Sequence, residues 1–175
     1  MTNEYNYGIK FLPSALNKIY RKTFLTDNLL TFPEHIFFED QPFSYSCTLA
    51  ANRVVCVPQV VYHHYKRSGS IVQSFNQKNI DDMMTAYKMI KEYLQKNNIY
   101  KKFRFNYYSS LQHFYNLIVR QIFEFVPDEK SKKEYLKYSF IRLKEVIDID
   151  EYIDFLSSEE LRKHIQPNIT DTTIY

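Results

Sequence analysis

Two neighbouring carboxyl residues, Glu39 and Asp40, stand at the predicted start of a helix. They belong to the run Phe38-Glu39-Asp40-Gln41-Pro42-Phe43, and a proline just inside a helix with acids in its first turn is typical of a helix N-terminus. A carboxylate there is held in a fixed orientation, which suits a base that takes a proton from a substrate hydroxyl. Asp is also a favoured N-cap residue, and capping is the commoner role. On local grounds both roles stay open for Asp40.

A basic loop, Tyr65-Lys66-Arg67-Ser68-Gly69-Ser70-Ile71, follows a predicted strand. Arg67 offers a planar fork suited to phosphate oxygens, and Lys66 offers a point charge. Ser68 and Ser70 add hydroxyl donors, so the loop could hold a diphosphate. The alternative is a solvated basic turn that ends in glycine.

The sequence predicts no metal site in this chain. His63 and His64 are adjacent, so on a strand they point to opposite faces, and at most one of them could serve as a ligand. No HExxH motif or paired-cysteine spacing is present. Cys47 and Cys56 lie in apolar stretches without a nucleophile motif, which predicts reduced, buried thiols and a cytoplasmic protein.

The composition excludes several classes of protein. The chain has 175 residues, 45% of them hydrophobic, and only two glycines, where average usage would give about a dozen. Neither a Walker A loop nor a GxGxxG loop can be written from two glycines. The net charge of +3, from 23 basic and 20 acidic residues, is too balanced to indicate a nucleic-acid partner. The sequence shows no secretory signal and no run long enough to span a membrane.

The elements that must position these residues differ between the two parts of the chain. Residues 1–75 carry short apolar runs of mixed period and predict an α/β part. Within it we expect a short amphipathic helix over 15–24, an extended or irregular stretch over 29–38 and a helix ending near Asn52. The runs 54–57 and 60–65 predict two short strands or one bent strand.

Residues 76–175 carry sustained helical periodicity and predict a mainly α-helical C-terminal domain. Two helices come first, each marked by a stripe of apolar residues at helical spacing. A third helix should run from Asp128 through Phe140 to Ile147, and a fourth over about 151–164. The first stripe comprises Ile80, Met83, Met84, Tyr87, Ile90 and Leu94, and the second comprises Phe105, Tyr108, Leu111, Tyr115, Ile118, Ile122 and Phe125.

Four short elements, taken in order, resemble the second half of glycosyltransferase family 2 enzymes of the GT-A fold. They are ALNKIYRKTFL over 15–25, LTFPE over 30–34, FED over 38–40 and YHHYKRSGSI over 62–71. Each element alone is common, and their order and spacing over about residues 13–75 carry the resemblance. It implies that residues 1–75 are the acceptor-side part of a GT-A catalytic domain, a partial α/β fold.

The resemblance also implies an activity. It is inverting transfer of a sugar from a nucleotide-sugar to a glycan or lipid-linked acceptor, in bacterial surface polysaccharide or glycan biosynthesis. By that resemblance Asp40 is the general base and Glu39 shapes the acceptor site. Lys66, Arg67, Ser68 and Ser70 would then lie near the donor diphosphate.

The family's nucleotide-binding half, which ends in an Asp-x-Asp metal motif, should precede residue 13 and is not in this sequence. A divalent metal, Mg or Mn, is implied for the complete enzyme, and none is expected for this chain alone. Asp148-Ile149-Asp150 spells the motif, but it follows Asp40, and a solvated helix end explains it better. We therefore expect a C-terminal part, inactive alone: a truncated reading frame, an expressed fragment or one half of a split enzyme.

A different class of function also stays open for the helical part. It could be a noncatalytic interaction or oligomerisation module, which predicts homo-oligomers through residues 76–175. Its lysine-rich and tyrosine-rich surface would also suit a peripheral position at the inner membrane face, although amphipathic stripes are more simply core.

Overall fold

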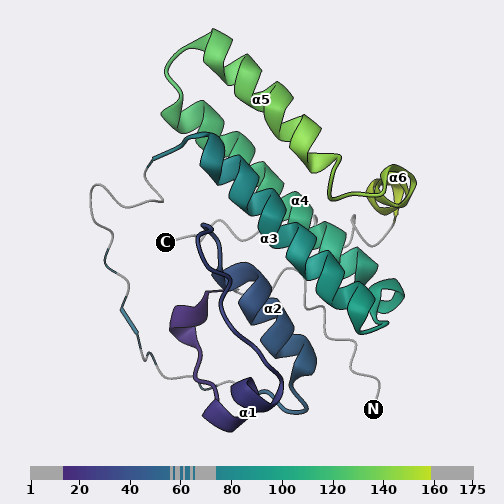
Figure 1. Ribbon diagram of the computed structural model, residues 1–175. Helices are drawn as coiled ribbons and strands as arrows, with labels where there is room; N and C mark the ends of the chain where they lie inside the picture. The colour runs from purple at the N-terminus through teal and green to yellow at the C-terminus, as the bar shows by residue number, and fades with distance from the viewer. Residues whose placement is uncertain are drawn as a thin grey trace.

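The computed structural model describes residues 14–55 and 74–158, together with residues 57, 60, 62, 63 and 65. These residues form one short 3-10 helix and six α-helices (Figure 1). In chain order they are η1 (Ala15–Asn17), α1 (Lys22–Asp27), α2 (Asp40–Ala50), α3 (Gln77–Lys96), α4 (Tyr100–Phe125), α5 (Glu129–Leu143) and α6 (Ile149–Ser157).

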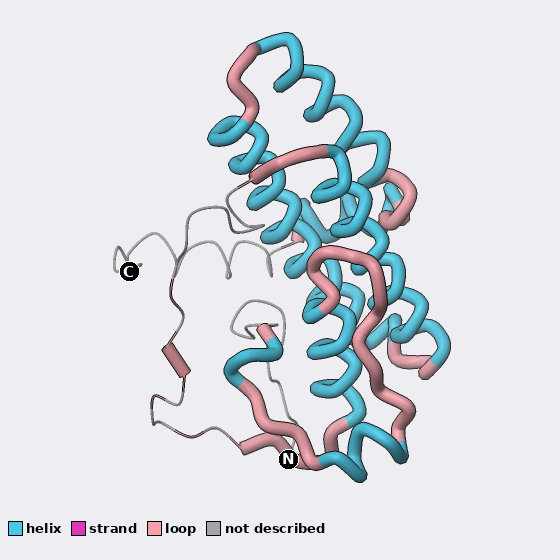
Figure 2. Tube along the Cα trace, turned by 60° about the vertical axis from the view of Figure 1, so that its left-hand side comes forward, coloured by secondary structure: helices cyan, strands magenta, loops and turns pink. Residues whose placement is uncertain are grey.

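The long helices α3 and α4 form an antiparallel hairpin, and α5 lies along it (Figures 1 and 2). The first expected stripe lies on α3, and each of its six residues is at most 2% exposed. In the second stripe, on α4, four residues are buried and three are half-buried. The first stripe is thus confirmed as core, and six of the seven residues of the second belong to the core or pack against it. The four buried residues of the second stripe are Tyr108, Leu111, Ile118 and Ile122.

Buried tyrosine hydroxyls in this core have hydrogen-bond partners. The Tyr87 hydroxyl lies 2.7 Å from the Ser110 hydroxyl, and the Tyr107 hydroxyl donates to the Val146 carbonyl at 3.0 Å. Tyr108 donates to the Glu151 carboxylate on α6 at 3.1 Å. A buried polar group without a partner would cost stability, so these bonds let a tyrosine-rich chain pack its aromatic rings inside.

Helix α2 packs against α3 and joins the same core. Tyr45 of α2 belongs to the hydrophobic cluster that α3 and α4 build, and the Tyr93 hydroxyl of α3 donates to the Ser46 carbonyl at 3.4 Å. The core therefore draws on residues on both sides of position 75. The expected division into residues 1–75 and 76–175 stays a prediction.

The expected α/β remnant of a GT-A fold is wrong, because the described residues contain helices and no strand. Residues 54 and 55, expected to begin a strand, are exposed, as are residues 57, 60, 62, 63 and 65. A strand needs a neighbouring strand to satisfy its backbone groups and a covering layer to bury its side chains. β-branched composition alone did not supply these partners.

The expected helix over 15–24 is also wrong, since η1 and α1 are separated by extended backbone at Lys18 and at Arg21. Ile19, placed on its apolar face, is 96% exposed. The helix from 40 onward ends at Ala50, close to the expected end. The stretch over 29–38 is irregular as expected, with left-handed backbone at Leu29, His35 and Phe38.

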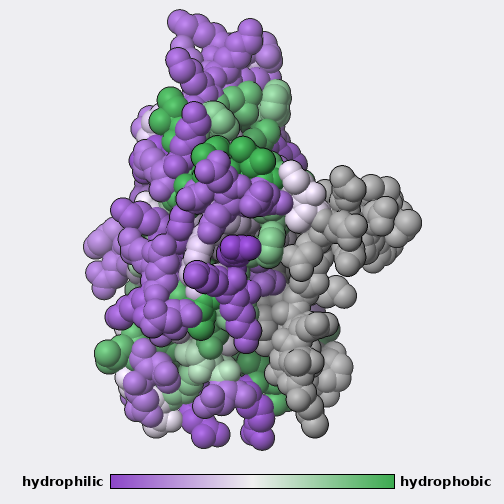
Figure 3. Space-filling view, turned by 90° about the vertical axis from the view of Figure 1, so that its right-hand side faces the viewer, coloured by the Kyte–Doolittle hydropathy of each residue, from purple (hydrophilic) through white to green (hydrophobic). Residues whose placement is uncertain are grey.

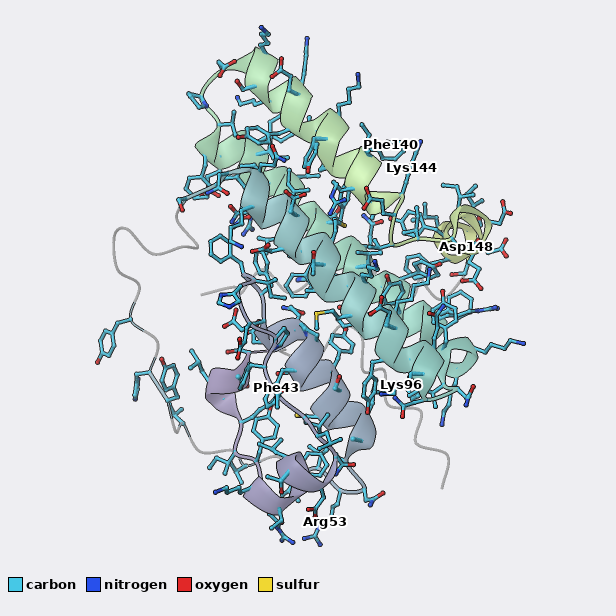
Figure 4. All side chains as sticks on the ribbon, in the orientation of Figure 1. Phe43, Arg53, Lys96, Phe140, Lys144 and Asp148 are labelled. Carbon is cyan, nitrogen blue, oxygen red and sulfur yellow. The ribbon has the colours of Figure 1, made fainter. Side chains whose placement is uncertain are left out.

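The third expected helix is present as α5, but it ends at Leu143 and not at Ile147. Phe140 is 49% exposed instead of lying in the core. Its ring lies 4.8 Å from the Lys144 ammonium (Figure 4). Ile141, Ile149 and Ile153 of α5 and α6 are also exposed, and Figure 3 shows apolar surface between hydrophilic residues on this side. The fourth expected helix is α6 as far as Ser157, and residues 159–164 lie outside the described part.

None of the described helices is both long enough and apolar enough to cross a bilayer.

Candidate functional site

Glu39 and Asp40 lie where a turn over residues 37–39 runs into α2. Glu39 is exposed and occupies the N-cap position without a side-chain cap bond, while Asp40 is the first helical residue and is half-buried. Asp40 is therefore not the N-cap residue that local statistics favoured. Its half-buried carboxyl nevertheless accepts hydrogen bonds from the N–H groups of Asp40 and Gln41 at the start of α2.

The surroundings of Asp40 shift its proton affinity. Burial raises the pKa of the Asp40 carboxyl, and the negative charge of Glu39 adds to the rise. The N–H groups of Asp40 and Gln41 and the Lys18 ammonium oppose this shift only in part. A carboxylate with a raised pKa holds a proton more strongly, so it is a better general base at neutral pH.

Lys18 is the cation beside Asp40. Its ammonium donates to the Ser14 carbonyl at 2.8 Å and to the Asn17 side chain at 2.7 Å. Burial lowers the pKa of Lys18, and the Asp40 charge opposes that shift. These two bonds fix the positive charge near the carboxylate.

Three aromatic rings pack one helical turn beyond Asp40. Phe43, only 3% exposed, stacks on Phe32 with ring centroids 3.7 Å apart and meets Tyr20 edge-on at 5.2 Å. Phe43 lies between α2 and the N-terminal segment (Figure 4). Phe32 and Tyr20 belong to two separate elements of the sequence resemblance. Three of the four elements of the resemblance, over 15–25, 30–34 and 38–40, therefore lie close together at the start of α2.

The structure does not bring every expected site residue to this place. Lys66, Arg67, Ser68 and Ser70 lie outside the described residues, as do His64 and Cys56. His63 is described and is exposed. The donor side of the expected site therefore stays a prediction.

A divalent metal has no ligand set in the described part of the chain. No three His, Cys, Asp or Glu side chains there come together in a way that could hold an ion. Asp148 instead caps α6, its carboxylate accepting from the N–H groups of Asp150 and Glu151 at 3.1 Å each. The interpretation of Asp148-Ile149-Asp150 as a helix end is confirmed.

Cys47 is buried and unpaired with another cysteine, and burial raises the pKa of its thiol to about 11. Because the thiolate is the reactive form, this residue is not an activated nucleophile. The expectation of a buried thiol is confirmed for Cys47.

Sequence reasoning missed two charged residues of α3 that contact the turn before Asp40. The Asp82 carboxylate accepts from the Phe37 N–H at 2.7 Å and lies 2.6 Å from the Lys78 ammonium. Their spacing of four residues, beside the apolar stripe, suggests a helical ion pair. This spacing gives no sign of the contact with Phe37, which lies 45 residues earlier in the chain than Asp82.

Comparison with known proteins gives one informative match. No protein-family model and no solved structure matches the chain. A protein of Bacillus subtilis (strain 168), described as "Putative glycosyltransferase EpsH", is 32% identical over 93 residues, which cover 50% of this chain and 26% of that protein. The chain is thus related to a described glycosyltransferase, and it spans about a quarter of the length of that relative.

Proposed function

We propose that this chain is the acceptor-side part of an inverting glycosyltransferase of family 2. The observation that carries the proposal is the half-buried Asp40, whose pKa is raised by burial and by Glu39 at the start of α2. Three of the four elements that resemble the family lie around that residue. The relationship to a described glycosyltransferase over half the chain supports the same class of reaction.

In the proposed reaction Asp40 is the general base. Its carboxylate takes the proton of the acceptor hydroxyl as the hydroxyl oxygen forms a bond to the anomeric carbon of the donor sugar. The bond from that carbon to the diphosphate oxygen breaks, and its electron pair leaves with the nucleoside diphosphate. Attack from the face opposite the leaving group inverts the anomeric centre. Asp40 then releases its proton to water.

The residues around Asp40 have supporting roles in this proposal. Glu39, exposed beside the base, shapes the acceptor site and keeps the base strong by charge repulsion. Lys66, Arg67, Ser68 and Ser70 would contact the donor diphosphate. The described residues offer no ligand set for a divalent metal, and the metal implied for the complete enzyme would be held by its nucleotide-binding half.

The nucleotide-binding half of the proposed enzyme is assigned to protein outside these 175 residues. The length of the relative, of which this chain spans about a quarter, supports that assignment. We further propose that the acceptor is a bacterial surface glycan or its lipid-linked precursor, handled at the cytoplasmic face of the membrane.

Release of nucleoside diphosphate tests this function. A protein that joins these residues to the nucleotide-binding half should release diphosphate from a panel of nucleotide-sugars when a cell-envelope extract of the source organism is added. The 175-residue chain alone should show neither release nor metal-dependent binding of those donors by calorimetry. Absence of release from the joined protein would contradict the transferase assignment. Micromolar donor affinity of the chain alone would contradict the assignment of the donor site to the other half.

A further inference from the structure

Asp82 of α3 contacts the turn over residues 37–39, which leads into Asp40 at the start of α2. Its side chain is only 10% exposed, and its carboxylate accepts from the backbone N–H of Phe37 at 2.7 Å. A charged acceptor makes a hydrogen bond about twice as strong as a neutral one. The bond joins α3 to a residue three positions before Asp40.

Lys78 adds further contacts to the same turn. Its ammonium lies 2.6 Å from the Asp82 carboxylate and donates to the His35 carbonyl at 3.0 Å. The same ammonium lies 4.8 Å from the centroid of the Phe37 ring. Asp82 and Lys78 therefore bind the backbone of residues 35 and 37 from one face of α3.

The turn needs such support because its backbone is strained. His35 has φ 64° and Phe38 has φ 61°, in the left-handed region that non-glycine side chains seldom occupy. Strained positions of this kind persist only where the surrounding structure fixes them. The Phe38 carbonyl accepts a hydrogen bond from the Gln41 N–H at 3.0 Å. This bond connects the strained segment to the first turn of α2.

We propose that Asp82 is a positioning residue for Asp40: it holds the strained turn so that the Asp40 carboxylate keeps one orientation toward the acceptor hydroxyl. The catalytic part of this inference rests on the proposed function. It makes α3 a component of the acceptor site and not a separate interaction module.

The neighbouring Asp81 provides a matched control on the same helix. Its carboxylate accepts from the Tyr138 hydroxyl at 2.6 Å and pairs with Arg142 at 3.0 Å, both on α5. Asp81→Ala therefore removes an acid of α3 whose contacts with Tyr138 and Arg142 are directed to α5 rather than to the turn. Asp82→Asn is the conservative variant, since its amide oxygen can still accept from the Phe37 N–H.

NMR of the full 175-residue chain tests the positioning without an activity assay. In Asp82→Ala the amide of Phe37 should exchange with solvent about tenfold faster or more, and the carboxyl titration of Asp40 should shift. Asp82→Asn should restore most of the amide protection, and Asp81→Ala should change neither signal. Unchanged signals in Asp82→Ala, or equal changes in Asp81→Ala, would overturn the inference.

Kinetics of the transfer-competent protein then test the catalytic part. Asp82→Ala should lower kcat on the order of 10- to 100-fold with the KM for the donor unchanged, and Asp82→Asn should rescue most of the loss. If Asp82→Ala does not fold, Lys78→Met tests the same contacts, with the amide of Phe37 and the Asp40 titration as readouts. If the NMR signals of Phe37 and Asp40 shift but neither the parent protein nor any variant transfers sugar, the proposed function is contradicted. The role of Asp82 in positioning Asp40 would then still hold. Shifted signals with an unchanged kcat would overturn the catalytic part.

Discussion

Asp40→Asn is expected to lower the rate of sugar transfer by about 10²- to 10⁴-fold, the usual contribution of a general base. An amide is nearly the same size as the carboxyl and can accept the same hydrogen bonds, but it cannot take a proton from the acceptor hydroxyl. The measurement is nucleoside diphosphate release by the joined protein at saturating donor.

The same substitution is expected to leave stability unchanged or to increase it. The folded state raises the pKa of Asp40, so between the ordinary and the raised value the folded chain binds more protons than the unfolded chain. Stability therefore falls as pH rises through that window, and ionised Asp40 costs stability at neutral pH. Asn at position 40 removes this cost. Urea unfolding at pH 7 measures the effect.

Asp27→Asn is the matched control, because Asp27 is an exposed carboxylate at the end of α1. It should change neither the transfer rate nor the stability. A loss of about 1 kcal/mol or more in Asp40→Asn, with transfer retained, would instead indicate a structural helix-start role.

Tyr87→Ala is expected to lower the free energy of unfolding by about 3–5 kcal/mol, as for other large buried rings. Tyr87 is fully buried on α3, with its ring centroid 5.9 Å from that of Tyr107 and 6.1 Å from that of Phe114. The substitution leaves a cavity in the α3–α4 hairpin and removes the hydroxyl partner of Ser110. Urea unfolding followed by circular dichroism measures the change.

Two variants separate the contributions at this position. Tyr87→Phe keeps the ring and removes only the hydroxyl and its bond to Ser110. Because the Ser110 hydroxyl is also hydrogen-bonded to Tyr45, the cost should be about 0.5–1.5 kcal/mol. Tyr65 is 80% exposed, and Tyr65→Ala should stay within about 0.5 kcal/mol of the parent. A Tyr87→Ala cost as small as that of Tyr65→Ala would contradict the packing of the hairpin.

The helical hairpin could be predicted from the sequence because its signal is local and repeated. Ile80, Met83, Tyr87, Ile90 and Leu94 recur at helical spacing over several turns, and each is buried in α3. Periodicity of this length reports one face of one helix, whatever its partner is. The Asp128 and Asp148 caps are equally local, and both start helices.

The described residues of the runs 54–57 and 60–65 form no strand, for the opposite reason. A run such as Val54-Val55 indicates a side chain suited to a sheet, but a sheet also requires a partner strand, which a local pattern cannot show. Ile19 likewise carried the right spacing for a helix face and is exposed. Short apolar runs leave the choice of element to tertiary contacts.

The helix start at Asp40 could be predicted from the sequence, but the residues that pack around it could not. The acids and proline over 39–42 indicated a helix start, and α2 begins at Asp40. The stack of Phe32 on Phe43 and the bond from Phe37 to Asp82 join residues 11 and 45 positions apart. Contacts at such separations depend on how α2 and α3 pack, and no spacing rule describes them.

The pH dependence of kcat/KM for sugar transfer tests the assignment of Asp40 as the general base most directly. The base must be ionised, so the rate should fall tenfold per pH unit below its pKa. We expect the midpoint of this acid limb to lie above the ordinary aspartate value, because burial and Glu39 raise the pKa of Asp40. In Asp40→Asn that limb should be absent and the remaining rate low. Full transfer by Asp40→Asn, or an identical acid limb in both proteins, would contradict the assignment.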